Sequence, residues 1–340
     1  MSENEKLIGP KRVGEITRSE FRQLMERNKI NLQKTNTQVA KILAEVRSEG
    51  DRALVRLERK FDGANLSTKG LRVSSNEMQN ANRAVSRDVK NEIRRVTARI
   101  VKVHNQQLPR EGMLLDADGV RVREIHRALP SVGIYIPGGT AAYPSTALML
   151  SAPARVAGVE RIVACSPPSS DGTVNPLVLV ALDIVGVNEI YKVGGAQAIA
   201  AMAYGTRTIP SVGKIIGPGN IYVTTAKWMV SDEVGIDFPA GPSEVLVIAD
   251  DSAKPSLIAA DLISQAEHDP YSVAVLISLS EKLAVSVKQA VNDAIQNVAR
   301  QNVIRASFKR HGALLVSESR DAAVEFANQF AAEHVELVVN

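Results

Sequence analysis

The sequence predicts an α/β fold built on a doubly wound parallel sheet. From Gly133 onward, short β-branched runs that end in glycine or proline alternate with alanine-rich stretches of helical length. Strands that alternate with helices of this length indicate right-handed parallel crossovers, which place helices on both faces of a sheet. The expected strands are 133–136, 161–165, 189–193, 214–216 and 245–249, and the helices between them are 145–156, 176–185, 196–204 and 221–230.

The segment before Gly133 is predicted to be mostly helical. Thr17 and Glu20 have the spacing of a capping box, so a short helix is expected to begin there. Helices are also expected over 36–49 and 51–61, because a glycine between them can adopt the left-handed conformation that ends a helix. The other elements expected here are a long amphipathic helix over 86–107 and strands at 71–73 and 119–125.

The last third of the chain continues the alternation of helices and strands. A further set of parallel crossovers is therefore expected after the strand at 245–249. Its expected helices are 256–267, 281–298 and 320–332, and its expected strands are 272–279, 313–316 and a last one that begins at Val335.

The composition excludes several classes of protein. The chain has 340 residues, 45% of them hydrophobic and 23% charged, which is enough for a sizeable core and about two domains. Its net charge of +4 is spread along helices and only 4% of its residues are aromatic, so nucleic-acid binding is not expected. The N-terminus lacks the pattern of a signal peptide, the apolar runs are too short for a membrane span, and the single Cys165 suits a reducing compartment. We expect a cytoplasmic protein without a membrane or nucleic-acid partner.

Glycine-rich loops follow several of the predicted strands. The loops 135–140, 194–197 and 217–220 lead into helices, and a fourth spans 239–244. In a parallel sheet, ligands collect at the carboxyl ends of the strands, where glycine permits close approach and helix N-terminal amides bind anionic groups such as pyrophosphate. Each loop alone could equally be a tight turn, but four of them favour a binding crevice. None has the G-x-G-x-x-G pattern of a standard dinucleotide fold.

Two polar pairs are the candidates for metal binding and catalysis. Gln265 and His268 lie three apart at the end of an apolar helical run, so their side chains would project from one face. An imidazole is a common zinc ligand, and an amide oxygen one turn away can bind the same ion. The alternative interpretation is that His268 is a structural or surface residue. Glu333 and His334 form an acid–imidazole pair at a helix–strand boundary, where α/β proteins place chemistry.

Cys165 suggests a different mechanism. A thiolate nucleophile would be natural in an aldehyde-oxidising enzyme. However, Cys165 ends the predicted strand 161–165, where a free cysteine usually acts as a small buried hydrophobe. We therefore interpret Cys165 as a structural residue.

Taken together, these loops and polar pairs resemble one family. Similarity to the histidinol dehydrogenases runs in order from about Ile16 to Asn340, through the motifs Y-I-P-G-G-T, V-G-G-A-Q-A-I-A-A, G-P-G-N, P-A-G-P-S-E-V-L-V-I-A-D, D-L-I-S-Q-A-E-H and E-H-V-E. The resemblance implies two Rossmann-like domains with an architecture related to the aldehyde dehydrogenases, and a zinc-dependent homodimer. The expected organisation is a helical element over 1–30, a first domain from 31–134 and 245–340, and a second domain inserted over 135–244.

The resemblance also implies roles for single residues. The family oxidises L-histidinol to L-histidinal and then to L-histidine, with two NAD per turnover, in the last step of histidine biosynthesis. Zinc would hold the imidazole and amine of the substrate, His334 would remove the hydroxyl proton, and Glu333 would activate the water that attacks the aldehyde. The implied NAD contacts are Tyr135, Gln197 and Asn220; the implied substrate contacts are Ser243, Gln265, His268 and His334; the implied zinc ligands are Gln265 and His268.

One departure from the family bears on activity. Family members continue past the position equivalent to Asn340, and their tail supplies an aspartate ligand, a further acid and a histidine that completes the zinc site of the neighbouring subunit. The predicted last strand, with no helix after it, favours a fragment of a longer protein. The alternative is a shortened, non-catalytic relative that serves as a nucleotide-binding or oligomerisation module.

Overall fold

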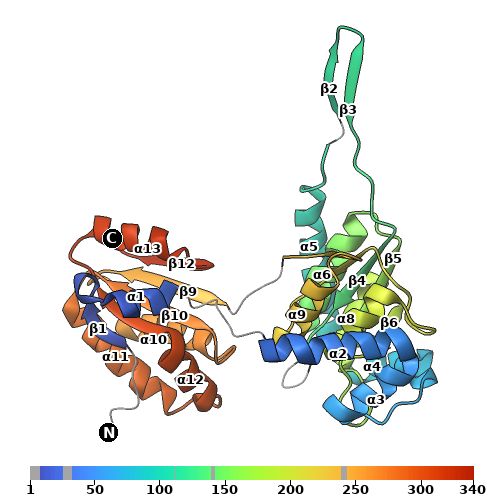
Figure 1. The fold of residues 1–340 in the computed structure, drawn as a ribbon, viewed down its shortest axis with the longest axis horizontal. Helices are drawn as coiled ribbons and strands as arrows, with labels where there is room; N and C mark the ends of the chain where they lie inside the picture. The colour runs from blue at the N-terminus through green and yellow to red at the C-terminus, as the bar shows by residue number, and fades with distance from the viewer. Residues whose placement is uncertain (1–7, 26–32, 111, 139–141, 239–242) are drawn as a thin grey trace. The chain divides into compact units, whose positions relative to one another are not determined.

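The computed structural model describes residues 8–25, 33–110, 112–138, 142–238 and 243–340. Contacts divide the chain into two compact units, of which unit 1 combines residues 1–31 with 240–340 and unit 2 contains residues 32–239. Each unit is built on a five-stranded parallel sheet flanked by helices (Figure 1). The predicted α/β class with doubly wound sheets is therefore confirmed. No helix within the described ranges is long and apolar enough to cross a membrane.

Unit 2 contains the strands of the central part of the chain. The spatial order of its sheet is β6-β5-β4-β7-β8, and all neighbouring strands are parallel. From β4 the chain moves to one side through β5 and β6, and then to the other side through β7 and β8. The direction therefore reverses between β4 and β7, and a ligand crevice is expected at the carboxyl ends of these strands. The bounds are β4 (Ser131–Tyr135), β5 (Arg161–Ser166), β6 (Glu189–Lys192), β7 (Lys214–Ile216) and β8 (Gly235–Ile236).

Two separate hydrophobic cores cover the two faces of this sheet. Side chains of a strand point alternately to its two faces, and in β4 Tyr135 is buried in one core and Ile134 in the other. The core around Tyr135 contains α2 (Gln33–Glu49), α3 (Asp51–Phe61), α8 (Gly195–Tyr204) and α9 (Ile221–Met229). The core around Ile134 contains α4 (Ser75–Ala84), α5 (Arg87–Asn105), α6 (Pro144–Val156) and α7 (Pro176–Val185).

An antiparallel hairpin precedes β4 in unit 2. Strand β2 (Gly112–Ala117) pairs with β3 (Val120–Glu124), and the two form a sheet of their own, visible as a separate ribbon in Figure 1. The strand predicted at 119–125 is thus confirmed as β3. The apolar side chains of Leu114 and Val120 are 65% and 53% exposed. Because a two-stranded hairpin alone is only marginally stable in water, this apolar surface is a candidate contact surface.

Unit 1 joins the N-terminal strand to the C-terminal part of the chain. The spatial order of its sheet is β1-β11-β10-β9-β12, again all parallel. From β9 the chain passes through β10 and β11 and then returns to the other side of β9 as β12. The strands are β1 (Ile8–Arg12), β9 (Glu244–Ala249), β10 (Val273–Ser278), β11 (Gly312–Val316) and β12 (His334–Val338). One core contains α10 (Pro255–Ala266), α11 (Glu281–Ile295) and α12 (Gln301–His311), and the other contains α1 (Arg18–Met25) and α13 (Arg320–Phe330).

Reciprocal caps start two of the helices. The Glu20 amide donates to Thr17 Oγ1 at 3.2 Å, and Glu20 Oε2 accepts from the Thr17 amide at 2.8 Å. The predicted capping box ahead of α1 is therefore confirmed. Ser74 and Glu77 form the same arrangement ahead of α4, a helix that the sequence analysis does not predict.

The strand predicted at 71–73 is wrong. Residues Lys69–Leu71 form a 3-10 helix, and Arg72 makes only an isolated antiparallel bridge to Tyr191. The reason is local, because the Gly70 amide bonds the carbonyl of Ser67 at 2.9 Å and thereby tightens the chain into a turn.

The division into units differs from the expected domains. Residues 32–134, which the resemblance groups with 245–340, lie in unit 2 together with 135–239. Packing explains this, because Val39 of α2 and Leu54 of α3 belong to the same core as α8 and α9. The segment expected as a separate helical element over 1–30 supplies β1 and α1 to unit 1, where β1 pairs with β11.

Candidate active site

The three implied NAD contacts lie near the carboxyl ends of the strands in the unit 2 sheet. Tyr135 is the last residue of β4, Gln197 lies in the first turn of α8 after β6, and Asn220 is the N-cap of α9 after β7. All three therefore lie at or just after the carboxyl ends of parallel strands, on both sides of the reversal between β4 and β7. Residues 139–141 of the first glycine-rich loop and 239–242 of the fourth lie outside the described residues.

Tyr135 is fixed inside the core below these strand ends. Its side chain is 4% exposed, and its hydroxyl oxygen accepts a hydrogen bond from the Gly195 amide at 3.1 Å. Burial raises the pKa of the Tyr135 phenol above its usual range, so it stays neutral. The side chain thus connects the end of β4 to the start of α8, and it cannot serve as a base.

Asn220 and Gly217 shape the loop after β7. Asn220 Oδ1 accepts from the amides of Tyr222 and Val223 at 3.0 and 3.2 Å, which caps α9. Gly217 has φ +126°, and a Cβ at this position would lie 2.3 Å from the carbonyl oxygen of Tyr135. Only glycine fits so close to the end of β4 with this backbone conformation.

Gly217→Ala is expected to destabilise unit 2 by about 2–4 kcal/mol, because backbone strain and a steric clash with β4 act together. Gly186→Ala is the matched control, since Gly186 also has a positive φ, +84°, but no atom within 4 Å of the added Cβ. The control should cost only about 1 kcal/mol. Denaturant unfolding of both variants measures the difference, and equal losses would contradict the clash.

Gln197 is held by a buried carboxyl group that the sequence analysis does not identify. Gln197 is 1% exposed, and its Nε2 donates to Glu58 Oε1 at 2.9 Å. The Gly194 amide donates to the same oxygen at 3.0 Å. Glu58 is fully buried, and its Oε2 has no hydrogen-bond partner among the described residues. The available signal was an acid in the apolar stripe of α3, one residue after Leu57 and four after Leu54.

The environment of Glu58 favours its protonated form. Burial raises the pKa of Glu58 to about 8, and the nearby carboxylate of Asp62 contributes in the same direction. Burial also raises the pKa of Asp62. The folded protein therefore binds more protons than the unfolded chain between about pH 4.5 and 8, so its free energy of unfolding should fall as pH rises through this window.

Glu58→Gln is expected to remove this pH dependence. Glutamine keeps an acceptor oxygen for Gly194 and Gln197 but carries no titratable proton, so the variant should exceed the wild type in stability at pH 9 by on the order of a few kcal/mol. Urea unfolding at several pH values from 5 to 9 would show the two curves separating as pH rises. Parallel curves would mean that Glu58 is ionised in the folded protein throughout this range.

A cleft lies at the same carboxyl ends of the strands in the unit 2 sheet. It has a volume of about 530 Å³ and lies over the ends of β4 and β5. Its wall includes Pro137 and Gly138 after β4, Ser166 and Ser169 at the end of β5, and Asp62 after α3. The side chains of Tyr135 and Gln197 are buried behind these strand ends and do not belong to the lining.

The catalytic and metal candidates lie in unit 1, near the amino ends of its strands. His334 is the first residue of β12 and pairs in register with Val245, while Ser243 directly precedes β9. Gln265 and His268 lie where α10 ends ahead of β10. These residues therefore gather at the amino ends of the strands. Each of these residues precedes its strand or, in the case of His334, begins it, so the rule for carboxyl ends does not describe this group.

His334 is oriented by the backbone. Its Nδ1 lies 3.2 Å from the carbonyl oxygen of Glu244, so Nδ1–H can donate to that oxygen and leave Nε2 as the free acceptor. Glu333 Oε2 lies 3.7 Å from the same Nδ1. The backbone of Ser243 is also fixed, since its carbonyl accepts from the Val273 amide at 3.1 Å. The imidazole of His334 is mostly exposed and thus accessible to a substrate.

Gln265 and His268 supply an incomplete set of metal donors. Gln265 Nε2 is buried and has no hydrogen-bond partner among the residues that the structure describes, whereas His268 is exposed one turn further on. Within the described residues, no group of three or more His, Cys, Asp or Glu side chains is placed to hold a metal ion. A catalytic zinc site usually has three protein ligands and an open position. The described residues therefore fit part of a zinc site, and we derive no catalytic step through zinc.

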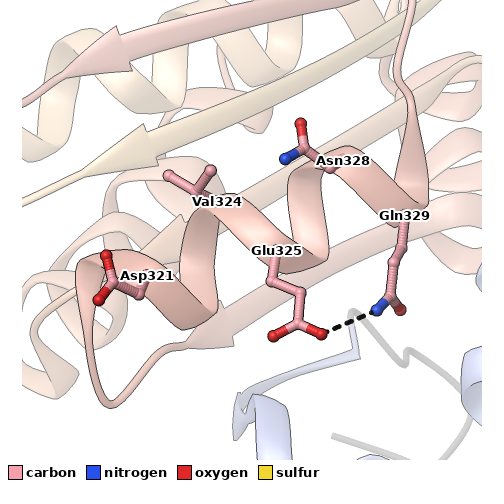
Figure 2. Close-up of a pocket in the computed structure, with 5 residues that line it drawn as sticks. All are labelled: Asp321, Val324, Glu325, Asn328 and Gln329. Atoms are coloured by element: carbon pink, nitrogen blue, oxygen red, sulfur yellow. Dashed lines mark hydrogen bonds between the residues drawn. The ribbon is translucent and has the colours of Figure 1, made fainter.

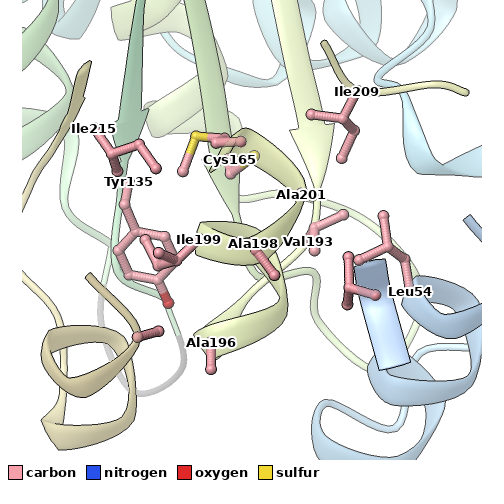
Figure 3. Packing of buried hydrophobic residues seen from close by; sticks show 14 of the residues in the cluster. Leu54, Tyr135, Cys165, Val193, Ala196, Ala198, Ile199, Ala201, Ile209 and Ile215 are labelled. Carbon is pink, nitrogen blue, oxygen red and sulfur yellow. The ribbon is translucent and has the colours of Figure 1, made fainter. Parts of the chain in front are cut away.

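Cys165 is unsuited to nucleophilic chemistry. It is fully buried, packed in the same core as Tyr135 and Ile215 (Figure 3). Burial raises its pKa above the usual range of a thiol, which disfavours the reactive thiolate. The interpretation of Cys165 as a structural residue agrees with this environment.

A second hollow, of about 450 Å³, lies along α13 and involves none of the candidate residues. Figure 2 shows that its walls come from this one helix, where Gln329 Nε2 donates to Glu325 Oε1 at 3.3 Å. Because a single helix surface forms it, we regard it as a surface depression.

The structure is an α/β protein with a cleft at the carboxyl ends of the sheet in one unit and an acid–imidazole pair in the other. The family model for histidinol dehydrogenase matches residues 25–340. A histidinol dehydrogenase from Methanothermobacter thermautotrophicus is 47% identical over 96% of this chain and 76% of its own length. One from a Synechococcus species is 47% identical over 88% of this chain and 69% of its own length. The crystal structure of histidinol dehydrogenase from Elizabethkingia anophelis superposes with a TM-score of 0.85 at 37% identity, covering 95% of this chain and 74% of that chain. The chain belongs to the histidinol dehydrogenase family, a group of oxidoreductases.

Proposed function

We propose that this protein oxidises L-histidinol to L-histidinal and then to L-histidine with NAD, in histidine biosynthesis. The observation that carries the proposal is the orientation of His334, whose Nδ1 faces a backbone carbonyl and whose Nε2 is left to accept a proton. Membership of the histidinol dehydrogenase family over residues 25–340 supports the substrate and favours an enzyme over a non-catalytic module.

In the first oxidation, His334 Nε2 accepts the hydroxyl proton while the carbon-bound hydrogen leaves with its electron pair. NAD, when bound, supplies the acceptor for that hydride in each of the two oxidations. In the second oxidation, Glu333 takes a proton from the water that attacks the aldehyde carbon, and His334 again accepts the proton of the resulting hydroxyl. In this division of roles His334 accepts one proton in each oxidation, and Glu333 accepts the proton of the attacking water.

The cleft of unit 2 supports NAD as the cofactor. It lies at the carboxyl ends of β4 and β5, where doubly wound folds bind nucleotides, and its wall includes Gly138 and the hydroxyl groups of Ser166, Ser169 and Ser170. Tyr135 and Gln197 would act from behind this wall, by fixing the start of α8. Asn220 would act by fixing the start of α9.

Gln265 and His268 are the proposed zinc ligands of this chain. Zinc would polarise the substrate and anchor its imidazole, with Ser243 as a further substrate contact. Only the amide oxygen of Gln265 can bind a cation. Its buried Nε2 has no hydrogen-bond partner among the described residues, and as a donor it would take an acceptor atom of the substrate, because buried polar atoms rarely lack a partner.

We also propose that the protein acts as a homodimer. The exposed Leu114 and Val120 of the hairpin are apolar side chains that a second copy could cover. Sedimentation of the wild type and of a Leu114→Glu variant tests this contact. A shift of the variant toward monomer supports it, and an unchanged dimer would place the interface elsewhere.

The proposed reaction is tested by incubating the protein with L-histidinol, NAD and excess zinc. Two NADH should form for each histidine detected by chromatography. Absence of NADH under these conditions, together with absence of NAD binding by calorimetry, would overturn the proposed function.

A further inference from the structure

The cleft of unit 2 occupies one side of the crevice expected at the carboxyl ends of its sheet, the side of β4 and β5. Its wall comes from the segments after β4 and β5, the first and second strands of this sheet in chain order. In doubly wound folds the adenosine half of a dinucleotide lies on the side of the first and second strands, and an acidic side chain there accepts the 2′-hydroxyl of its ribose. The cleft therefore corresponds to the adenosine side of the crevice.

The usual source of that acid is absent here. The segment at the end of β5 contributes Ser166, Ser169 and Ser170 to the wall, and no carboxylate. The acid in the wall is instead Asp62, which follows α3 and comes from a distant part of the chain. Among the described residues that line the cleft there is no lysine or arginine that could bind a phosphate.

We propose that Asp62 is the residue that selects NAD over NADP, by accepting the 2′-hydroxyl of the adenosine ribose and repelling a 2′-phosphate. This inference rests on the proposed use of a nicotinamide cofactor. The preference for NAD over NADP would then depend on the side chain of Asp62 and not on the glycine-rich loops.

Two features hold Asp62 in place and charged. Its amide donates to the carbonyl of Glu58 at 2.9 Å, which caps the end of α3. Burial raises the pKa of both carboxyl groups, but Glu58 is fully buried whereas Asp62 is only half-buried in the wall of the cleft, so Asp62 is the member of the pair that ionises more readily. Asp62, which lines the cleft, then carries the negative charge. The lone carboxylate in a wall without basic groups is well placed to disfavour a dianionic phosphate.

The test compares binding of NAD, NADP, 5′-AMP and 2′,5′-ADP to the wild type and to Asp62→Asn by calorimetry. Asparagine keeps an acceptor for the hydroxyl but removes the charge. The wild type should bind NADP at least about 10-fold more weakly than NAD, a difference of about 1.4 kcal/mol, and the variant should lose most of this preference. The pair 5′-AMP and 2′,5′-ADP should show the same change, because it differs at the same position.

Asp62→Ser and Asp171→Asn complete the design. Asp62→Ser should also lose the preference, which guards against a folding defect particular to asparagine. Asp171 directly follows Ser170 but does not line the cleft, so Asp171→Asn should keep the preference. If both Asp62 variants bind NAD and still reject NADP as the wild type does, the inference fails while the proposed function stands. If the wild type binds neither NAD nor NADP, the proposed cofactor itself is wrong, and this inference with it.

Discussion

His334→Ala is expected to abolish oxidation of both histidinol and histidinal. The same imidazole accepts a proton in each step. Its Nδ1 lies 3.2 Å from the Glu244 carbonyl oxygen and is used for that hydrogen bond, so Nε2 is the ring nitrogen that acts as the base. Loss of a general base usually lowers a rate by about 10²–10⁴-fold, and here the loss should apply to each step. Steady-state assays started separately from histidinol and from histidinal, with excess zinc, measure it.

Glu333→Gln provides the comparison for this prediction. It removes the group that activates water but leaves alcohol oxidation feasible, so it should slow the reaction from histidinal more than the reaction from histidinol. His104→Ala, in the last turn of α5, is a control that should not affect either rate. Equal losses from both substrates in Glu333→Gln would contradict the division of roles between Glu333 and His334.

The layered α/β class could be predicted from the sequence because its signal is local and repeated. Strands such as Arg161–Ser166 are buried over all but their first residue, and each is followed by a helix with a recognisable start. The capping box at Thr17 and Glu20 was readable for the same reason, since four residues determine it. The equivalent signal at Ser74 and Glu77 was present in the sequence, and the helix it starts could have been predicted by the same rule.

Long-range packing set the limits of prediction. The grouping of residues 32–134 with 135–239 depends on contacts such as those of Val39 and Leu54 with α8, which no local pattern encodes. The same holds for Glu58, whose partners Gly194 and Gln197 lie far along the chain. The glycine-rich loop 194–197 indicates the position of Gln197, whereas the carboxyl group that holds Gln197 lies 139 residues away in the chain.

The candidate residues lie at different strand ends in the two sheets. In unit 2 the candidate cofactor residues follow the strands, as the rule for doubly wound sheets predicts. In unit 1 the candidate Ser243 precedes β9 and His334 begins β12, so the carbonyl of Glu244 at the start of β9 can accept a hydrogen bond from His334 Nδ1–H. A rule based on carboxyl ends therefore locates a cofactor crevice but misses an acid–imidazole pair whose orientation depends on an adjacent strand.

Zinc is expected to bind this 340-residue chain weakly and to dissociate on dialysis. Complete four-ligand sites contribute roughly 10–16 kcal/mol, and a set of two donors should contribute about half, which corresponds to dissociation constants of roughly 1–200 μM. One of the two donors, Gln265, offers only a neutral amide oxygen, which lies at the weak end of zinc ligands. Without added zinc, turnover of histidinol should therefore be negligible, while added zinc should restore part of it.

Metal analysis after dialysis, combined with NADH formation at saturating histidinol, measures both effects. His268→Ala should weaken zinc binding by at least about 10-fold, because it removes the imidazole donor, whereas His126→Ala should leave it unchanged. Stoichiometric zinc that survives dialysis, together with sustained turnover, would contradict the prediction. It would show that a further side chain completes the site, and Glu267 and Asp269, which flank His268 in the sequence, would then be the first residues to replace.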